Sequence, residues 1–298
     1  MTRQRGWHRP SREFVGVGLV LVSAAGFGTL GIFGIYAQRA DLTIPTVLAY
    51  RFALAAVLVW ALLAWRGRLE PLRERSLAIA LGLGAFGYAT MSGLYFVGLE
   101  FMTAGLVAIV LYTYPAFVVV LAVATIGERV RVLTIVALCL SLGGVALVVG
   151  ANPAGASTAG VLVVLCAALA YALYITVSRE LLVTVDPLVL TAHVLPAAGV
   201  TFVVVGAATG DLQVPSAPSA WAILLGIAVL ATALPVVAFF AGIERIGASR
   251  TGIVSTAEPA VTVVLGAVLL AEPVTLATVA GGALILAGVV AIQRDVAS

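Results

Sequence analysis

The sequence predicts an all-α membrane protein in which ten transmembrane helices form two inverted five-helix repeats around a central cavity. Its 298 residues are 62% hydrophobic and 10% charged, whereas about 25% of residues are charged in an average soluble domain. The apolar residues form ten long runs, and the second half of the chain repeats the first. These runs are too long, and alternate too little, for the strands of a membrane barrel.

Each apolar run has the length of one membrane-spanning helix, which needs about 20 mainly apolar residues. We expect spans at residues 14–36, 45–65, 77–99, 103–126, 132–150, 158–177, 187–208, 219–243, 247–271 and 276–292. The first run follows an arginine-rich start, as the apolar region of a signal peptide does. It is too long for that region and lacks a small-residue cleavage site, so we expect an uncleaved first span.

The internal repeat is clearest around the fourth and ninth spans. Residues 95–130 and 239–274 align without a gap at an offset of 144, with 13 identities in 36 positions. The identical pairs include Gly98/Gly242, Glu100/Glu244, Pro115/Pro259 and Glu128/Glu272. A shared bias towards Val, Ala and Leu would not align the rarer Glu and Pro residues. Because each copy holds an odd number of spans, the second copy enters the membrane from the opposite side, as in the inverted repeats of transporters.

The basic residues predict the orientation in the membrane. All 16 are arginines, of which 14 fall on one predicted face, while Arg39 falls on the other and Arg51 lies within a span. Positively charged loops stay in the cytoplasm, so we expect a multi-pass protein of the cytoplasmic membrane with both termini cytoplasmic. The arginines are spread over short loops without forming a patch, which argues against nucleic-acid binding.

These observations divide the chain into five parts. We expect a cytoplasmic tail at residues 1–13, a first five-helix repeat at 14–150, a linker at 151–157, a second five-helix repeat at 158–292 and a cytoplasmic tail at 293–298. No connection between the spans is long enough for a soluble domain, so no further domain is expected.

Two prolines indicate a site near the middle of the membrane. Pro115 and Pro259 stand at equivalent mid-span positions of the fourth and ninth spans. Each removes a backbone hydrogen bond and frees a carbonyl group. Such defects are tolerated at membrane depth only when they are packed in protein or face a wet cavity. We therefore predict a central site and a hinge at Pro115 and Pro259, about which the two halves rock.

Glu258, directly before Pro259, is the strongest candidate for a functional group. A carboxylate near the bilayer centre is costly, so it should face the interior. Its repeat mate is Tyr114, so the repeats differ chemically at this point. Three roles stay open: binding an amino or cationic group of a substrate, coupling transport to a proton, or a structural role in hydrogen bonds to a neighbouring Ser, Thr or Tyr. The two functional roles are preferred.

Arg51 and His193 are the other ionisable groups inside spans. We expect Arg51 to extend outwards along the second span, towards Asp41, Glu100 or Glu272, because long basic side chains commonly reach the membrane surface in this way. For His193 we expect a hydrogen-bonded packing role rather than a proton relay.

Tyrosines concentrate in the third, fourth and sixth spans. A mid-span tyrosine needs a partner for its hydroxyl, so it tends to face a cavity or another polar group. Hydrogen bonding between packed helices is the alternative for any single tyrosine, but the set favours a cavity. The side chains expected to bind the substrate are Phe27, Tyr88, Ser92, Tyr95, Tyr112, Tyr114, Tyr171, Tyr174, Phe239, Ser255, Thr256 and Glu258.

Other motifs indicate helix packing rather than chemistry. Residues 82–87 match G-x-G-x-x-G but lie inside a span, after no strand, so we interpret them as close helix packing. Gly143, Gly144 and Gly150 in the fifth span are echoed by Gly281, Gly282 and Gly288 in the tenth. These glycines predict packing within the chain or in a homodimer, and both stay open. Cys139 and Cys166 lack metal-site spacing, so neither a metal nor a cofactor is expected.

Taken together, these features resemble the drug/metabolite transporter superfamily, specifically its EamA-type ten-span members. The matching elements are the two five-span halves, Arg51-Phe52 early in the second span, residues 98–115 with their repeat 242–259, Glu128 and Glu272 closing the fourth and ninth spans, and the glycine-rich fifth and tenth spans. The resemblance implies a central cavity lined mainly by spans one, three, four, six, eight and nine, with five and ten at the periphery. Phe27 stands where a tryptophan is frequent in such proteins.

The function expected from the residues and the resemblance is transport. We expect a secondary transporter or facilitator that exports a small metabolite, such as an amino acid, across the cytoplasmic membrane by alternating access and without ATP. Its expected partners are a small-molecule substrate, the lipid bilayer and a coupling proton or ion. The alternative is a membrane-embedded enzyme acting on a lipid or isoprenoid, but the sequence offers no HExxH motif, no paired intramembrane Asp and no lysine.

Overall fold

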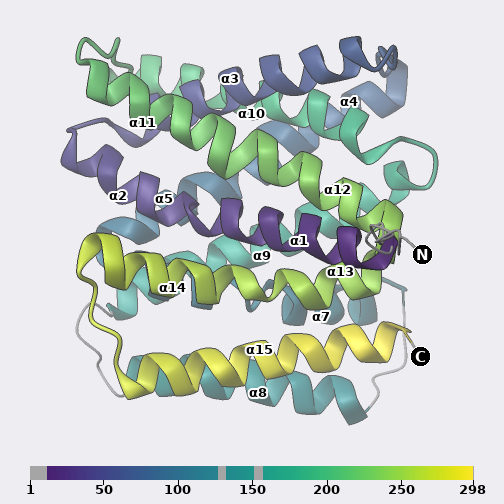
Figure 1. Ribbon diagram of the computed structural model, residues 1–298, viewed down its shortest axis with the longest axis vertical. Coiled ribbons are helices and arrows are strands. Elements are labelled where there is room, and N and C mark those ends of the chain that lie inside the picture. Colours follow the sequence, from purple (N-terminus) through teal and green to yellow (C-terminus); the bar gives the residue numbers. More distant parts are fainter. Residues whose placement is uncertain (1–11, 127–131, 151–156, 298) are drawn as a thin grey trace, which may run out of the picture.

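The structure is a computed structural model that describes residues 12–126, 132–150 and 157–297. All regular elements within these ranges are helices, which run roughly along one direction (Figure 1). Eight of them, counting joined segments together, are long and apolar enough to cross a membrane, and Leu276–Ala291 adds a shorter apolar stretch. The prediction of an all-α membrane protein is therefore confirmed. Glu128 and nearly all of the predicted linker lie outside the described residues.

The elements follow the predicted spans, several of which are interrupted. The first repeat comprises α1 (Arg12–Gly28), α2 (Leu30–Arg39), α3 (Ile44–Trp65), α4 (Glu74–Gly82), η1 (Leu83–Tyr88), α5 (Ala89–Phe101), α6 (Ala104–Leu111), α7 (Tyr114–Ile126) and α8 (Val132–Gly150). The second comprises α9 (Thr158–Leu182), α10 (Pro187–Thr209), α11 (Pro218–Ala228), η2 (Val229–Ala233), α12 (Leu234–Ile246), α13 (Ala248–Ser255), α14 (Ala257–Leu270) and α15 (Leu276–Ala297). Both η segments are π-helical turns within long helices.

Local sequence explains where several helices begin. The hydroxyl of Thr43 caps α3, that of Thr103 caps α6, and that of Ser157 caps α9. The Asp186 carboxylate caps α10, where Pro187 occupies the first turn. These side chains accept hydrogen bonds from backbone N–H groups that have no partner inside the helix, and proline fits there because its missing N–H is not needed.

The interruptions occur at equivalent positions of the two repeats. The fourth span breaks at Tyr112 and Thr113, and the ninth breaks at Thr256, which is the repeat mate of Tyr112 at the offset of 144. The third and eighth spans carry their π-helical turns at nearly equivalent residues. Such turns are rare inside α-helices and are often found at functional sites. Both pairs of defects therefore belong to the repeated architecture.

The two repeats interlock instead of lying side by side. The most extensive helix contacts join α1 to α12, α3 to α10, α5 to α9 and α8 to α15, and every one of these pairs crosses between the repeats. The α8–α15 pair lies at one edge of the bundle in Figure 1, and α3 with α10 lies at the opposite edge. The predicted rocking of the two halves about Pro115 and Pro259 stays a prediction, and it would have to rearrange these contacts between the repeats.

The glycine motifs serve close packing within the chain. A Cβ at Gly144 would lie 2.5 Å from the carbonyl oxygen of Gly281, so α8 and α15 approach through these residues. A Cβ at Gly84 would collide with the Val194 carbonyl oxygen, which explains one glycine of the G-x-G-x-x-G segment. Gly143 faces open space and leaves the homodimer hypothesis untested.

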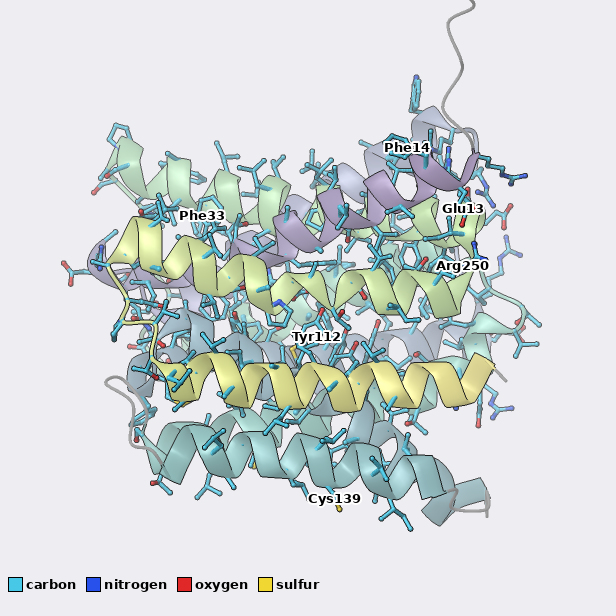
Figure 2. The ribbon with its side chains drawn as sticks, turned by 60° about the horizontal axis from the view of Figure 1, so that its bottom comes forward. Glu13, Phe14, Phe33, Tyr112, Cys139 and Arg250 are labelled. Atoms are coloured by element: carbon cyan, nitrogen blue, oxygen red, sulfur yellow. The ribbon has the colours of Figure 1, made fainter. Side chains whose placement is uncertain are left out.

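The bundle has two chemically different ends. The loops at one end carry most of the described arginines, and the start of α1 and the end of α15 both lie there, as Figure 1 shows on its right side. Glu13 and Arg250 form an ion pair at this end (Figure 2). We call this the arginine end. The opposite end, with Asp41, Asp211 and Glu272 in its loops, is called the acidic end.

Candidate functional site

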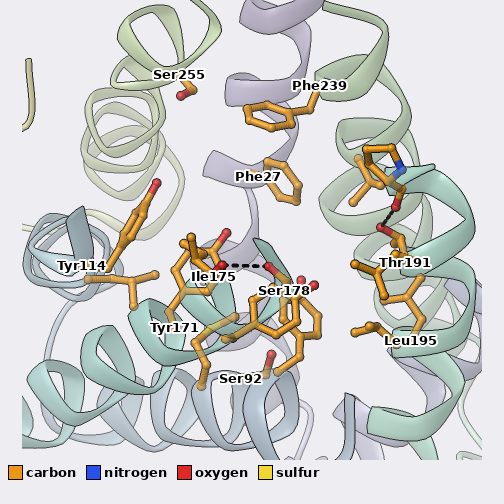
Figure 3. Close-up of a pocket in the computed structure, with 18 of the residues that line it drawn as sticks. Phe27, Ser92, Tyr114, Tyr171, Ile175, Ser178, Thr191, Leu195, Phe239 and Ser255 are labelled. Atoms are coloured by element: carbon orange, nitrogen blue, oxygen red, sulfur yellow. Dashed lines mark hydrogen bonds between the residues drawn. The ribbon is translucent and has the colours of Figure 1, made fainter. Parts of the chain in front are cut away.

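A cavity of about 340 Å³ lies in the middle of the bundle. Side chains from spans one, two, three, four, six, seven, eight and nine line it, whereas the described residues of α8 and α15 do not. Its volume falls in the range of pockets for small molecules, about 300–1,000 Å³. In Figure 3, Ser92, Tyr171, Phe239 and Ser255 come from different elements and surround the same space.

Eleven of the twelve expected substrate contacts line this cavity. They are Phe27, Tyr88, Ser92, Tyr95, Tyr112, Tyr114, Tyr171, Tyr174, Phe239, Ser255 and Glu258. Thr256 is not among the lining residues, and its hydroxyl donates instead to the Ile253 carbonyl oxygen at 2.7 Å. Pro115 and Pro259 do not line the cavity either. They follow directly on the helix breaks beside it.

Five tyrosine rings form a continuous series along the cavity. The ring centroids are 5.8 Å apart for Tyr112 and Tyr114, 4.7 Å for Tyr114 and Tyr171, 6.1 Å for Tyr171 and Tyr174, and 5.5 Å for Tyr174 and Tyr88. These separations are typical of favourable aromatic pairs. The series offers a substrate both apolar ring faces and phenolic hydroxyls.

Tyr112 links the two broken spans through its hydroxyl. The hydroxyl oxygen lies 2.8 Å from the Ser255 carbonyl oxygen and 2.9 Å from Glu258 Oε2. The Ser255 carbonyl stands four residues before Pro259. In a continuous helix it would accept from the N–H of residue 259, but proline has no N–H. A side chain from the break in the first repeat therefore replaces the hydrogen bond lost at the break in the second.

The three oxygens in this contact cannot all be satisfied by Tyr112 alone. A tyrosine hydroxyl carries one hydrogen and also accepts, while the Ser255 carbonyl only accepts. A protonated Glu258 would donate to Tyr112 and leave the Tyr112 hydrogen for Ser255, whereas an ionised Glu258 would compete with Ser255 for it. Within the described residues, no basic side chain lies within ion-pair distance of Glu258.

Arg51 is a cavity residue, and the expectation that it extends to the membrane surface is wrong. The side chain is 1% exposed, and its Nε donates to Thr232 Oγ1 at 2.9 Å. The guanidinium carbon lies 4.8 Å from the centre of the Phe52 ring. The face of α3 that carries Arg51 is turned towards η2 of the second repeat, where Thr232 supplies an acceptor. Hydropathy indicated the depth of Arg51 in the membrane but not the direction in which it points.

His193 has the expected packing role. Its Nε2 accepts from the backbone N–H of Leu72 at 3.2 Å, and its Nδ1 lies 2.8 Å from the Val189 carbonyl oxygen. Because a carbonyl oxygen only accepts, Nδ1 carries the hydrogen and both ring nitrogens are satisfied. The ring also packs edge-on against Trp60. His193 is therefore fixed in the framework and does not line the cavity.

The cavity lining follows the symmetry of the internal repeat. At the offset of 144, seven pairs of lining residues are repeat mates: Phe27/Tyr171, Leu30/Tyr174, Arg51/Leu195, Ser92/Val236, Tyr95/Phe239, Leu111/Ser255 and Tyr114/Glu258. Applying the offset across the whole chain could have placed Arg51 and Leu195 at the site together. Ser178, Arg179 and Thr191 also line the cavity and were missed, because they lie closer to a helix end.

The lining extends from mid-bundle to the arginine end, where Arg179, Leu182 and Pro187 contribute. At the acidic end, by contrast, α6 packs on α14, and a Cβ at Gly105 would lie 3.1 Å from Val263 Cγ2. The other halves of the two broken spans, α13 and α7, lie at the arginine end and pack on different partners. There α13 packs on α1, α12 and α15, while α7 packs mainly on α9. The two broken spans are therefore together at the acidic end and apart at the arginine end.

Glu272 fastens the closed acidic end. Its carboxylate accepts from the backbone N–H groups of Ala104 at 2.7 Å and Gly105 at 3.1 Å. These are free N–H groups of the first turn of α6, where a negative charge is also favoured by the helix dipole. Glu272, in the loop between α14 and α15, thereby caps a helix of the other repeat.

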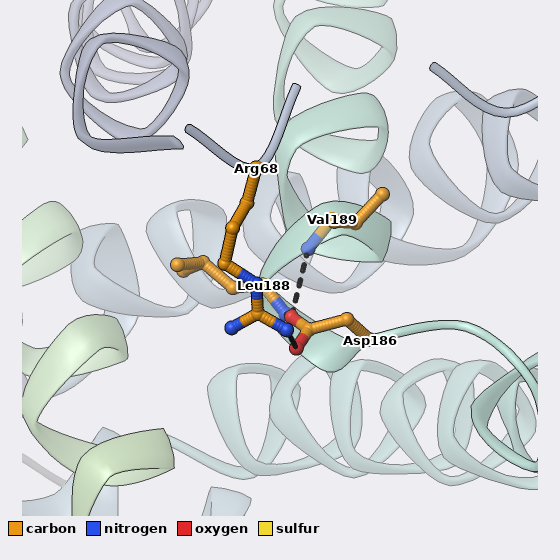
Figure 4. Close-up of polar contacts among 4 residues, drawn as sticks. All are labelled: Arg68, Asp186, Leu188 and Val189. Atoms are coloured by element: carbon orange, nitrogen blue, oxygen red, sulfur yellow. Dashed lines mark hydrogen bonds and ion pairs between the residues drawn. The ribbon is translucent and has the colours of Figure 1, made fainter. Parts of the chain in front are cut away.

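One cross-repeat pair, α3 with α10, is bonded at both ends. Arg68 and Asp186 form an ion pair of 2.9 Å at the arginine end, where Asp186 also caps α10 through Leu188 and Val189 (Figure 4). At the acidic end the Thr46 hydroxyl donates to the Asp211 carbonyl oxygen at 3.0 Å. We infer that α3 and α10 form a stable unit rather than a contact that opens.

Interlocked inverted repeats, broken central helices and a central cavity that carries a few polar groups define a multi-pass membrane transporter. The EamA-like transporter family model matches residues 14–150 and 158–294, so the chain belongs to this family. An uncharacterized transporter of Archaeoglobus fulgidus is 29% identical over 97% of this chain and 99% of its own length. The uncharacterized transporter YcbK of Bacillus subtilis is 29% identical, covering 88% and 87% of the two chains. A crystal structure with 18% identity shares the fold, with a TM-score of 0.66 over 97% of this chain.

Proposed function

We propose that the protein is a secondary transporter or facilitator that exports a small metabolite, such as an amino acid, across the cytoplasmic membrane by alternating access. The observation that carries this proposal is the cavity at the two broken spans, whose lining reaches only one end of the bundle. In an inverted repeat, the two halves can exchange conformations, and this exchange would open the cavity to the opposite side.

The arginines give the proposed direction. Arginine-rich loops stay in the cytoplasm, so the arginine end, with both termini, would be cytoplasmic. The cavity would then face the cytoplasm in this conformation and load from there. An exporter needs this loading state, and the subsequent step would release the substrate at the acidic end.

Release would require α6 and α14 to separate at the acidic end. The contacts that must break are the Glu272 cap on α6 and the close approach of Gly105 to Val263. The breaks at Tyr112 and Thr256 are suitable hinges, because they already interrupt the backbone hydrogen bonding of both spans. The α3–α10 pair would remain intact during this motion.

Glu258 is the proposed coupling group, through a proton or through a substrate ammonium group. The hydrogen bond between Glu258 and Tyr112 is fully compatible with the Ser255 contact only when Glu258 is protonated, so gain or loss of a proton would change the link between the two breaks. The other titratable groups that face Glu258 are the phenols of Tyr95, Tyr114 and Tyr171. Proton-coupled transporters commonly use such intramembrane carboxylates.

Counterflow in proteoliposomes tests the transport proposal. Liposomes containing the purified protein are preloaded with a mixed metabolite pool, and losses are measured by mass spectrometry against protein-free liposomes. We expect selective loss of one chemical class. Folded protein that moves no component of the pool, with or without a proton gradient, would contradict the proposal.

A further inference from the structure

Two buried polar atoms in the cavity have no hydrogen-bond partner. They are Arg51 Nη1 and Ser92 Oγ, and both side chains are 1% exposed. Both residues line the same cavity. Buried polar groups in proteins are almost always paired, so an unpaired one needs an explanation. Here one cationic donor and one hydroxyl stand unpaired in a single space.

The rest of the Arg51 side chain is held in place. Nε donates to Thr232 Oγ1, and the guanidinium lies over the Phe52 ring. Thr232 donates its own hydroxyl hydrogen to the Ile227 carbonyl oxygen at 2.8 Å, so it is committed as an acceptor towards Arg51. These contacts orient the guanidinium without neutralising it. Its free Nη1 is therefore a prearranged donor.

The positive charge of Arg51 is also unbalanced. Arginine stays charged in proteins, and a charge inside the membrane normally pairs with an opposite charge. Among the described residues, no carboxylate lies within ion-pair distance of Arg51. Its titratable neighbours are the phenols of Tyr88, which is also a hydrogen-bonding neighbour of the guanidinium, and Tyr95; neither phenol supplies a negative charge. A ligand that brings an anionic oxygen would supply both the missing charge and the missing acceptor.

The polar character of these two positions is not shared by their repeat mates. Arg51 and Ser92 have Leu195 and Val236 as repeat mates, and all of them line the cavity. The two symmetry-related positions are therefore apolar. A ligand that fits both pairs of positions has one anionic end and an apolar or aromatic body.

We propose that Arg51 Nη1 and Ser92 Oγ form a subsite for the carboxylate group of a monoanionic organic acid or amino acid. A planar guanidinium matches the geometry of a carboxylate. A single arginine balances one negative charge, which favours a carboxylate over a doubly charged phosphate. This assignment rests on the proposed transport function, because it names the chemical class that the transport site accepts. Glu258 would meet an ammonium group only if the substrate carries one.

Three probes with the same phenyl ring separate the charged groups. They are 3-phenylpropionate, phenethylamine and phenylalanine, which carry a carboxylate, an ammonium group and both groups. Dissociation constants are measured by calorimetry on the purified full chain, and counterflow of the same compounds is measured in proteoliposomes. We expect both carboxylates to bind. Phenethylamine should bind at least about tenfold more weakly, because hydrogen bonds to charged groups are stronger than those between neutral groups.

Ser92→Ala supplies the matched variant, with Val236→Ala at the repeat-related position as its control. Ser92→Ala should weaken 3-phenylpropionate binding about tenfold and leave phenethylamine unchanged, while Val236→Ala should not alter the preference for a carboxylate. Equal binding of phenethylamine and 3-phenylpropionate would overturn the subsite, as would an unaltered preference in Ser92→Ala or no binding of either carboxylate at millimolar concentration. Carboxylate binding without any counterflow would instead contradict the transport function.

Discussion

The two repeats share a backbone plan and differ in the chemistry of their cavity residues. Both have π-helical turns and broken spans at nearly equivalent positions, but the repeat mate of Arg51 is Leu195, and that of Tyr114 is Glu258. Symmetric backbone defects allow two related conformations. Asymmetric side chains allow a substrate with two different ends to bind in one orientation. At these paired positions the backbone therefore determines the motion, and the side chains determine the recognition of the substrate.

The closed acidic end gives the largest expected effect. A disulfide between Gly105→Cys and Val263→Cys would join α6 to α14, where the two backbones already approach closely. We expect oxidation to abolish nearly all counterflow and a reductant to restore it, because the two spans must separate for release. The measurement is proteoliposome flux before and after reduction, with each single-cysteine variant as a folding control.

A second disulfide tests a contact that is expected to stay closed during transport. Thr46→Cys with Gln213→Cys would join α3 to the connection that directly follows α10, where the Gln213 N–H donates to Thr46 Oγ1 at 2.8 Å. Since the α3–α10 pair is bonded at both ends, cross-linking it should leave flux nearly unchanged. Equal inhibition by both disulfides would show that the moving units have been assigned wrongly.

The next largest effect is expected from substitutions at the repeat mates Tyr114 and Glu258, which differ chemically. In Glu258→Gln the amide N–H can still donate to Tyr112, so the contact to Ser255 is kept while titration is lost. We expect the variant to fold and its flux to lose the pH response of the wild type, measured over the pH range in which both remain folded. Tyr114→Phe, at the repeat mate, should keep the pH response. A pH response retained by Glu258→Gln would rule out this carboxylate as the coupling group.

The peripheral α8–α15 pair should affect stability without affecting specificity. Gly144→Ala places a methyl group against the Gly281 carbonyl oxygen and Ile285, and such overpacking costs about 1–3 kcal/mol. Gly143→Ala meets open space inside the same helix, so it should not destabilise and should gain up to about 1 kcal/mol from the higher helix propensity of alanine. Thermal unfolding in detergent measures the difference. Binding preferences of the folded Gly144→Ala protein should stay unchanged, and a change would show that this pair communicates with the cavity.

The smallest effect is expected at the Arg68–Asp186 ion pair. Its side chains are 47% and 25% exposed, and pairs of this kind contribute about 0.2–1 kcal/mol. Arg68→Ala should therefore lower the melting temperature slightly and reduce flux little. Arg75→Ala is a suitable control, because the ion pair of Arg75 with Glu180 is longer, at 3.9 Å, and more exposed. A large loss of flux in Arg68→Ala alone would mean that this contact opens during transport.

The sequence was sufficient to predict the helices and the region of the site. Hydropathy located the spans, and the paired Pro115 and Pro259 indicated the broken region because proline disrupts helices in a known way. Hydropathy does not encode which face of a helix is turned inwards, so Arg51 was misplaced and Thr256 was included among the expected contacts. The interlocking of the repeats and the π-helical turns also depend on contacts between distant segments, which a linear pattern does not contain.

The series of tyrosine rings has an optical consequence. The described tryptophans, Trp60, Trp65 and Trp221, lie outside the cavity lining. The fluorescence of these three tryptophans would therefore be insensitive to the contents of the cavity. Phe27→Trp would place one indole among the tyrosines, where energy transfer from the phenols would make its emission a reporter of occupancy during a single turnover.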